Sequence, residues 1–180
     1  MSESPNEDTP VFYACITATP EGPPIEIAWA APAFETHGIT CESHLIQPPA
    51  AWRPELAQDL AAAQGYGLAL SDLQEFGTSP SELAEHMNEA LANRELFSGT
   101  AGGDVRVRRI FDAANVAPAF ALRRAAAEEL ITELARLRCL SSADVDRAKR
   151  EAEGMSLTGI RAEAKARYLA TFWAIVAYRN

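Results

Sequence analysis

The chain has 180 residues, 48% of them hydrophobic and 23% charged, which fits one globular domain with a sizeable core. No run reaches the roughly 18 uninterrupted apolar residues of a membrane span, so we expect no membrane association. The formal net charge of −9 disfavours a protein that grips nucleic acid mainly through its phosphates, because such binding needs clustered lysine and arginine.

The N-terminal residues 1–10 are polar and acidic and offer nothing to bury. They predict a disordered tail ahead of a single domain over 11–180. They also lack a charged-then-apolar signal pattern. The three cysteines are scattered and show no paired metal spacing, which indicates reduced thiols and a cytoplasmic location. Cys15 lies in an apolar run and is expected to be a core residue.

Three predicted strands come first. Residues 11–19 are rich in β-forming side chains, and after a turn over 20–24 the run 25–31 predicts a second strand in hairpin relation to the first. A third strand is expected over 39–46, where Pro48 stops it. The short connections indicate an antiparallel meander at the start of a mixed sheet.

Helices dominate the rest of the sequence. Ser79 as N-cap, Pro80 at the first position and Glu82 closing a capping box predict one helix start. Residues 95–98 predict a strand, and a glycine-rich turn over 99–103 follows it. The predicted helices lie around Leu56 and Leu60 and over 80–91, 104–111, 125–138, 141–154 and 160–178, with a loop at 116–120. This order predicts an α/β fold: a mixed sheet with an antiparallel three-strand start and parallel strands, flanked by helices.

Five short motifs occur in an order that resembles a known family. They are Pro24-Ile25-Glu26-Ile27-Ala28-Trp29; His44-Leu45-Ile46-Gln47-Pro48 with Trp52; Tyr66-Gly67-Leu68 with Leu73 and Gly77; Asp104; and the segment 161–170. Spread over 11–177, they are similar to the 3′–5′ exonucleases of the DEDD type (DEDDh subtype), which include proofreading exonucleases, ribonuclease T and oligoribonuclease. The resemblance implies a ribonuclease-H-like fold and a bacterial protein.

Members of this family are understood to hydrolyse phosphodiesters with two divalent ions held by four carboxylates, and with a histidine as general base. In this sequence the five equivalent positions are Ala14, Ile16, Asp104, Ile160 and Lys165. Only Asp104 keeps the family identity, as a weak remnant of a metal ligand. One carboxylate does not hold two divalent cations, and a lysine ammonium repels them. The resemblance therefore implies a degenerate site with no intact catalytic set and no bound metal or other cofactor.

These positions also have plainer interpretations. Ala14 and Ile16 share one face of their strand and fit a core. Asp104 is a preferred residue type at a helix N-cap. Lys165 is either solvated or occupies the vacated metal position and pairs with Asp104.

Several other polar residues are interpreted as structural. His44 has no partner at metal-ligand spacing, and Glu26 has no catalytic role that the resemblance assigns. The group Arg106, Arg108 and Arg109 predicts either a small basic patch or solvated surface.

We expect a catalytically degenerate exonuclease-like protein that binds a protein partner, or a nucleic acid or nucleotide that it does not cleave. The acidic composition favours the protein partner. The alternative is an active 3′–5′ exonuclease that uses Mg²⁺ or Mn²⁺ at a rearranged site, with Asp104, Glu163 and Glu26 as candidate ligands. Family members are often homodimers, so a homodimer is a further expectation.

Overall fold

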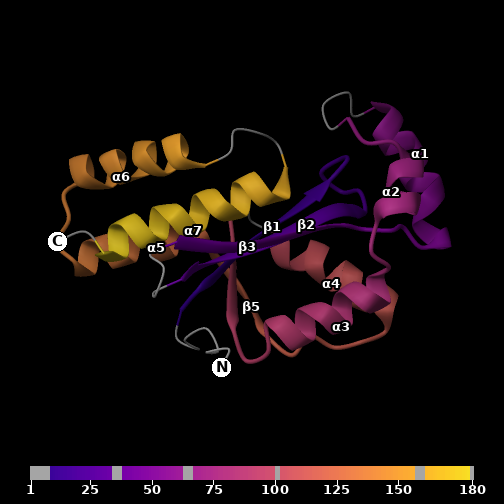
Figure 1. The fold of residues 1–180 in the computed structure, drawn as a ribbon, viewed down its shortest axis with the longest axis horizontal. Coiled ribbons are helices and arrows are strands. Elements are labelled where there is room, and N and C mark those ends of the chain that lie inside the picture. Colours follow the sequence, from indigo (N-terminus) through magenta and orange to yellow (C-terminus); the bar gives the residue numbers. More distant parts are fainter. Residues whose placement is uncertain (1–8, 34–37, 63–66, 100–101, 157–160, 179–180) are drawn as a thin grey trace.

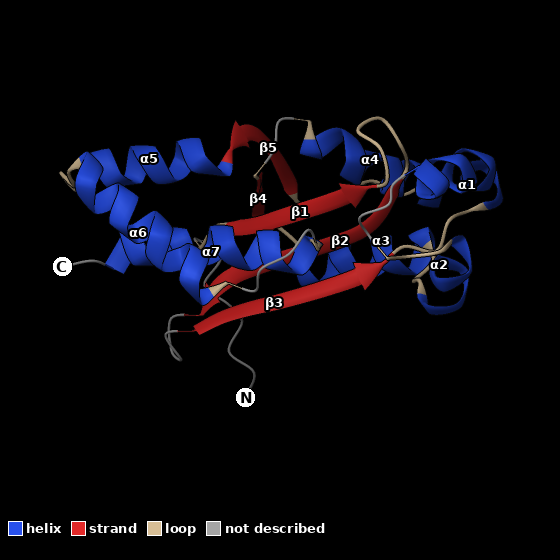
Figure 2. Cartoon of the chain, turned by 90° about the horizontal axis from the view of Figure 1, so that it is seen from above, coloured by secondary structure: helices blue, strands red, loops and turns tan. Residues whose placement is uncertain are grey.

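A computed structural model describes residues 9–33, 38–62, 67–99, 102–156 and 161–178. Its centre is one five-stranded sheet with helices packed on both faces (Figures 1 and 2). The spatial order of the strands is β3-β2-β1-β4-β5. Their bounds are β1 Val11–Thr17, β2 Pro24–Ala33, β3 Gly38–Leu45, β4 Glu95–Ser98 and β5 Ala121–Ala126.

The pairing of the strands confirms the predicted mixed sheet. β1 pairs antiparallel with β2, and β2 pairs antiparallel with β3, which is the expected meander. β1 then pairs parallel with β4, and β4 pairs parallel with β5. In the β1–β2 ladder Ala14 lies opposite Ala28 and Ile16 lies opposite Glu26. This register places Glu26 beside the predicted site positions.

The fifth strand was not predicted. The sequence indicated a loop over 116–120 and a helix from residue 125, whereas β5 occupies Ala121–Ala126 and helix α5 begins only at Ala127. The segment ALRRAA contains helix-forming residue types, so local propensity favours the wrong state. Its backbone is instead held by the parallel ladder to β4, a non-local interaction that overrides propensity.

Helices account for most of the remaining residues. Ser79 forms the predicted capping box with Glu82, and Ser141 forms a second one with Asp144. Helix α6 continues past Gly154, which was expected to end it, to Met155. The helices are η1 Ala50–Trp52, α1 Arg53–Ala62, α2 Leu70–Phe76, α3 Pro80–Ala90, α4 Gly103–Ala114, α5 Ala127–Leu137, α6 Ser142–Met155 and α7 Ala162–Tyr178.

The two faces of the sheet are covered by different helices, because side chains alternate along each strand. Phe12 contacts Trp173 of α7, with ring centroids 6.4 Å apart, so Phe12, Ala14 and Ile16 face α7. Trp29, which pairs with Tyr13, instead contacts His86 of α3. The sheet is thus buried between α7 on one side and α3 with α4 on the other (Figure 2).

The packed chain begins before β1. Of the predicted tail over 1–10, residues 1–8 lie outside the described part of the chain. Thr9 is buried, and its backbone carbonyl accepts a hydrogen bond of 2.8 Å from Arg94. Among the described helices, none has the length and apolar character required to cross a membrane.

Candidate functional site

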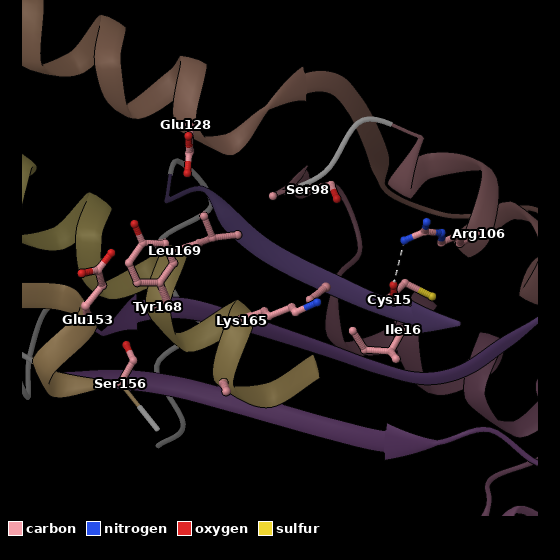
Figure 3. Close-up of a pocket in the computed structure, with 13 residues that line it drawn as sticks. Cys15, Ile16, Ser98, Arg106, Glu128, Glu153, Ser156, Lys165, Tyr168 and Leu169 are labelled. Carbon is pink, nitrogen blue, oxygen red and sulfur yellow. Dashed lines mark hydrogen bonds between the residues drawn. The ribbon is translucent and has the colours of Figure 1, made fainter. Parts of the chain in front are cut away.

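A cavity of about 440 Å³ opens on the α7 face of the sheet, next to the ends of β1 and β4. Figure 3 shows the side chains from strands and helices that surround it. Its walls combine apolar groups with both signs of charge. The lining residues are Ala14, Cys15, Ile16, Ser98, Gly99, Arg106, Glu128, Glu153, Ser156, Ala164, Lys165, Tyr168 and Leu169.

Three of the five family-equivalent positions meet at this cavity. Ala14 and Ile16 supply its floor from β1, and Lys165 enters from α7. Asp104 is not among the lining residues, and Ile160 lies outside the described part of the chain. The side chains of Ala14 and Ile16 have no oxygen, and Lys165 carries a positive charge. The lining at these positions does not fit a pair of Mg²⁺ or Mn²⁺ ions, which need oxygen ligands.

Asp104 is not the N-cap that the sequence predicted. Helix α4 begins at Gly103, directly after the N-cap Gly102 at φ 78°, so Asp104 falls in the first helical turn. Gly103 permits this start, because a Cβ atom there would lie 2.2 Å from Ser98 Oγ. The Tyr13 hydroxyl has a raised pKa, chiefly from burial and partly from the nearby Asp104 charge. Asp104 therefore acts on a buried tyrosine of β1.

Of the two alternatives for Lys165, the structure favours the solvated side chain over a pair with Asp104. Lys165 is an exposed residue of α7, and its side chain extends toward Cys15 and Ile16 (Figure 3). Within the described part of the chain, no ion pair involves Lys165. Its ammonium group is thus available to a ligand that enters the cavity.

A buried ion pair lies beside the cavity. Glu26 in β2 has a side chain only 3% exposed, and its Oε2 accepts a 2.8 Å hydrogen bond from Nε of Arg161, which directly precedes α7. This hydrogen bond raises the pKa of Arg161. The pair ties the start of α7 to the middle of the sheet, at the position opposite Ile16.

The three candidate ligands of a rearranged metal site make separate contacts in the structure. Glu26 is neutralised by Arg161, and Glu163 is bound at 2.8 Å by Arg167 one turn further along α7. Asp104, Glu163 and Glu26 do not form a group with mutually close ligand atoms among the described residues. Two of the three proposed carboxylates therefore already have a cation from the protein itself.

The remaining polar groups of the cavity are the carboxylates of Glu128 and Glu153 and several hydroxyl and thiol groups. Burial raises the pKa of the Cys15 thiol to about 12, against a smaller opposite effect of Arg106. Burial likewise raises the pKa of Tyr168 to about 12. The hydroxyls of Tyr168 and Ser156 are buried without a hydrogen-bond partner among the described residues. With these raised pKa values, the Cys15 thiol and the Tyr168 hydroxyl stay protonated at neutral pH and are not activated as nucleophiles.

The predicted arginine patch is largely tied to the protein backbone. Arg106 donates to the carbonyls of Cys15 and Pro20, which leaves it at the cavity rim. Arg109 donates to Glu55 at 2.8 Å and lies over the ring of Trp52, 5.5 Å from its centroid. These contacts fix the end of β1 and α1 against α4.

One group of functional side chains was missed by sequence reasoning. His44 was expected to have no partner at ligand spacing, but in the structure it lies beside Glu42 and His86. Glu42 and His44 are two residues apart on β3, which is a local signal of a shared face. His86 comes from α3, and no local spacing relates it to them.

Similar structures are known, although no family model and no curated protein sequence matches the chain. S. pombe Pop2p in its Mg²⁺- and Mn²⁺-bound form has a TM-score of 0.53 and 13% identity, over 94% of this chain and 83% of that one. An ExoI/SSB-Ct complex has a TM-score of 0.57 and 11% identity, over 96% of this chain and 42% of that one.

E. coli Exonuclease I in complex with a dT13 oligonucleotide has a TM-score of 0.50 and 13% identity, over 94% of this chain and 39% of that one. This chain thus spans about two fifths of the two ExoI chains, at 42% and 39%. It has the α/β, ribonuclease-H-like fold of these exonucleases, which confirms the predicted fold class.

The buried ion pair generates a stability prediction. We expect Arg161→Met to lower the free energy of unfolding by about 3 kcal/mol, because it leaves the Glu26 carboxylate buried without a cation. This loss is at the low end of the range for a buried ion pair that loses one partner, because the Arg161 side chain is 46% exposed and water screens its charge. Urea denaturation at neutral pH measures the loss.

A matched control is Arg136→Met, which removes the partner of Glu133 on the surface of α5. The side chains of Arg136 and Glu133 are 69% and 55% exposed, so water replaces the lost contact. We therefore expect little change in the free energy of unfolding. Equal losses in the two variants would show that the Glu26 pair has no special role in stability.

Proposed function

We propose that this chain is a catalytically degenerate exonuclease-like module that binds its ligand without cleaving it. The observation that carries the proposal is the convergence of Ala14, Ile16 and Lys165 on one cavity. Two-metal hydrolysis needs carboxylates there to hold the ions that activate water and stabilise the leaving oxygen. An apolar floor and a tethered ammonium group supply neither function.

The cavity favours a ligand of nucleotide size. Its 440 Å³ falls in the range of small-molecule sites, on the order of 300 to 1,000 Å³. Lys165 and Arg106 offer positive charge for a phosphate. The carboxylates of Glu128 and Glu153, and the hydroxyls of Ser156 and Tyr168 that lack a partner among the described residues, suit the polar groups of a sugar or base. A mononucleotide, or the last nucleotide of a strand, matches this distribution of groups.

A protein partner is the second candidate, favoured by charge. The net charge of −9 repels a long polyanion, so an extended nucleic-acid track is disfavoured. The similar folds include one described in complex with SSB-Ct and one with an oligonucleotide, so both modes of binding have structural precedents. We also propose a homodimer, in which the protein partner is a second copy of this chain.

The first functional prediction is the absence of nuclease activity. We expect the purified protein to leave labelled single-stranded DNA and short RNA intact in Mg²⁺ or Mn²⁺, with rates at least roughly 10³-fold below those of an enzyme with its catalytic set intact. Gel analysis of the 3′ ends measures this. Metal-dependent shortening that disappears in Asp104→Ala would overturn the proposal in favour of a rearranged metal site.

The second functional prediction concerns Lys165. We expect a fluorescent nucleoside monophosphate to bind in the presence of EDTA, and Lys165→Glu to weaken that binding roughly tenfold or more, because a charge-assisted contact to phosphate is lost. Fluorescence anisotropy gives both affinities. Arg136→Glu, the same charge change outside the cavity, should leave the affinity within about twofold of the wild-type value. No binding by the wild-type protein would exclude the nucleotide and leave the protein partner.

A further inference from the structure

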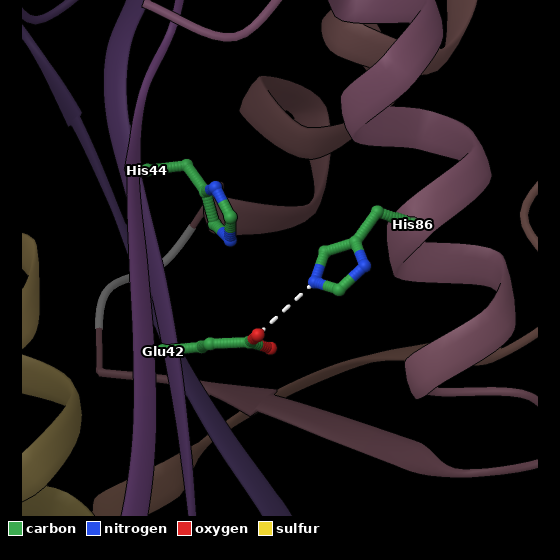
Figure 4. A group of neighbouring side chains, drawn as sticks. All are labelled: Glu42, His44 and His86. Atoms are coloured by element: carbon green, nitrogen blue, oxygen red, sulfur yellow. Dashed lines mark hydrogen bonds and ion pairs between the residues drawn. The ribbon is translucent and has the colours of Figure 1, made fainter.

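Glu42, His44 and His86 form a group of metal-ligand side chains on the face of the sheet opposite the cavity. Glu42 and His44 lie opposite Trp29 and Ile27 in the β2–β3 ladder, so both point toward the α3 side. His86 projects from the second turn of α3. Figure 4 shows the two imidazole rings turned toward the Glu42 carboxylate.

The spacing of the ligand atoms is close to that of a metal site. One ligand atom from each residue lies within 4.8 Å of the others, and His86 Nε2 is already 3.1 Å from Glu42 Oε1. Around a tetrahedral Zn²⁺ with bonds of about 2.0–2.1 Å, neighbouring ligand atoms are roughly 3.4 Å apart. Glu42 and His86 are 46% and 40% exposed, so rotation of their side chains can close the remaining gap.

His44 brings a nitrogen atom that lacks a partner. Its Nε2 is buried and makes no hydrogen bond with any described residue, although a buried polar atom normally has one. The His44 ring stacks on Trp29, with centroids 5.2 Å apart and an interplanar angle of 19°, and this contact holds the ring in its orientation. A bound cation would satisfy the orphaned nitrogen.

We propose that Glu42, His44 and His86 bind one Zn²⁺ ion. Two imidazoles and one carboxylate are a ligand set that suits zinc, and three protein ligands leave a fourth position for water or another ligand. The ion would join β3, an edge strand, to α3. It is separate from the two-metal centre of nucleases, because it lies across the sheet from Ala14 and Ile16 and contains histidine nitrogen, which Mg²⁺ disfavours.

The test uses the full chain, stripped of metal, in calorimetric titration with Zn²⁺ and in thermal unfolding. We expect one ion per chain and a rise in the unfolding temperature, because Zn²⁺ binds the folded state. Co²⁺ should give the visible absorption of a four-coordinate site. His86→Ala and Glu42→Gln, both at half-exposed positions, should fold normally and weaken Zn²⁺ binding at least roughly tenfold, since even supporting contacts are worth that much.

The matched control is His37→Ala, which removes the remaining histidine of the chain. It should bind Zn²⁺ as the wild-type protein does. The proposal is overturned if the wild-type protein takes up no Zn²⁺, or if His86→Ala and His37→Ala bind alike. Glu42 and His86 would then be an ordinary surface ion pair beside Trp29.

Discussion

The ion pair between Glu26 and Arg161 anchors the start of α7, the helix beside the cavity, to the middle of the sheet. A carboxylate with only 3% of its side chain exposed must be compensated by a nearby cation, and here the cation belongs to the protein. The pair joins β2 to the start of α7. It thereby sets where α7 crosses β1 and where Lys165 enters the cavity. Arg167 pairs in the same way with Glu163 on α7, so both carboxylates already have a cation from the protein.

The sheet separates two regions with different chemistry. On the α7 side lie the apolar floor of the cavity and Lys165, together with hydroxyl groups suited to holding a ligand. On the α3 side lie two histidines and a glutamate that suit a transition metal. Because side chains alternate along β3, Glu42 and His44 point away from the cavity. A metal bound by His44 would therefore stabilise the sheet edge without restoring hydrolysis.

Local sequence signals predicted the features that local interactions determine. The first three strands follow their runs of β-forming residues, and the capping boxes at Ser79 and Ser141 mark true helix starts. The wrong predictions concern features that depend on contacts between residues far apart in the sequence. β5 exists because β4 pairs with it, and His86 reaches His44 only after α3 folds onto the sheet. Asp104 was misplaced because Gly102 and Gly103 start α4 earlier than a side-chain cap would.

Diffraction from crystals soaked in Mn²⁺ shows whether the cavity holds a metal centre, which we propose it does not. Anomalous difference maps locate manganese without reference to activity. We expect no peak between β1 and α7, and a peak between Glu42 and His86 would agree with the second site. Two peaks about 4 Å apart near Ala14 and Asp104, at the spacing of a two-metal centre, would contradict the loss of that centre.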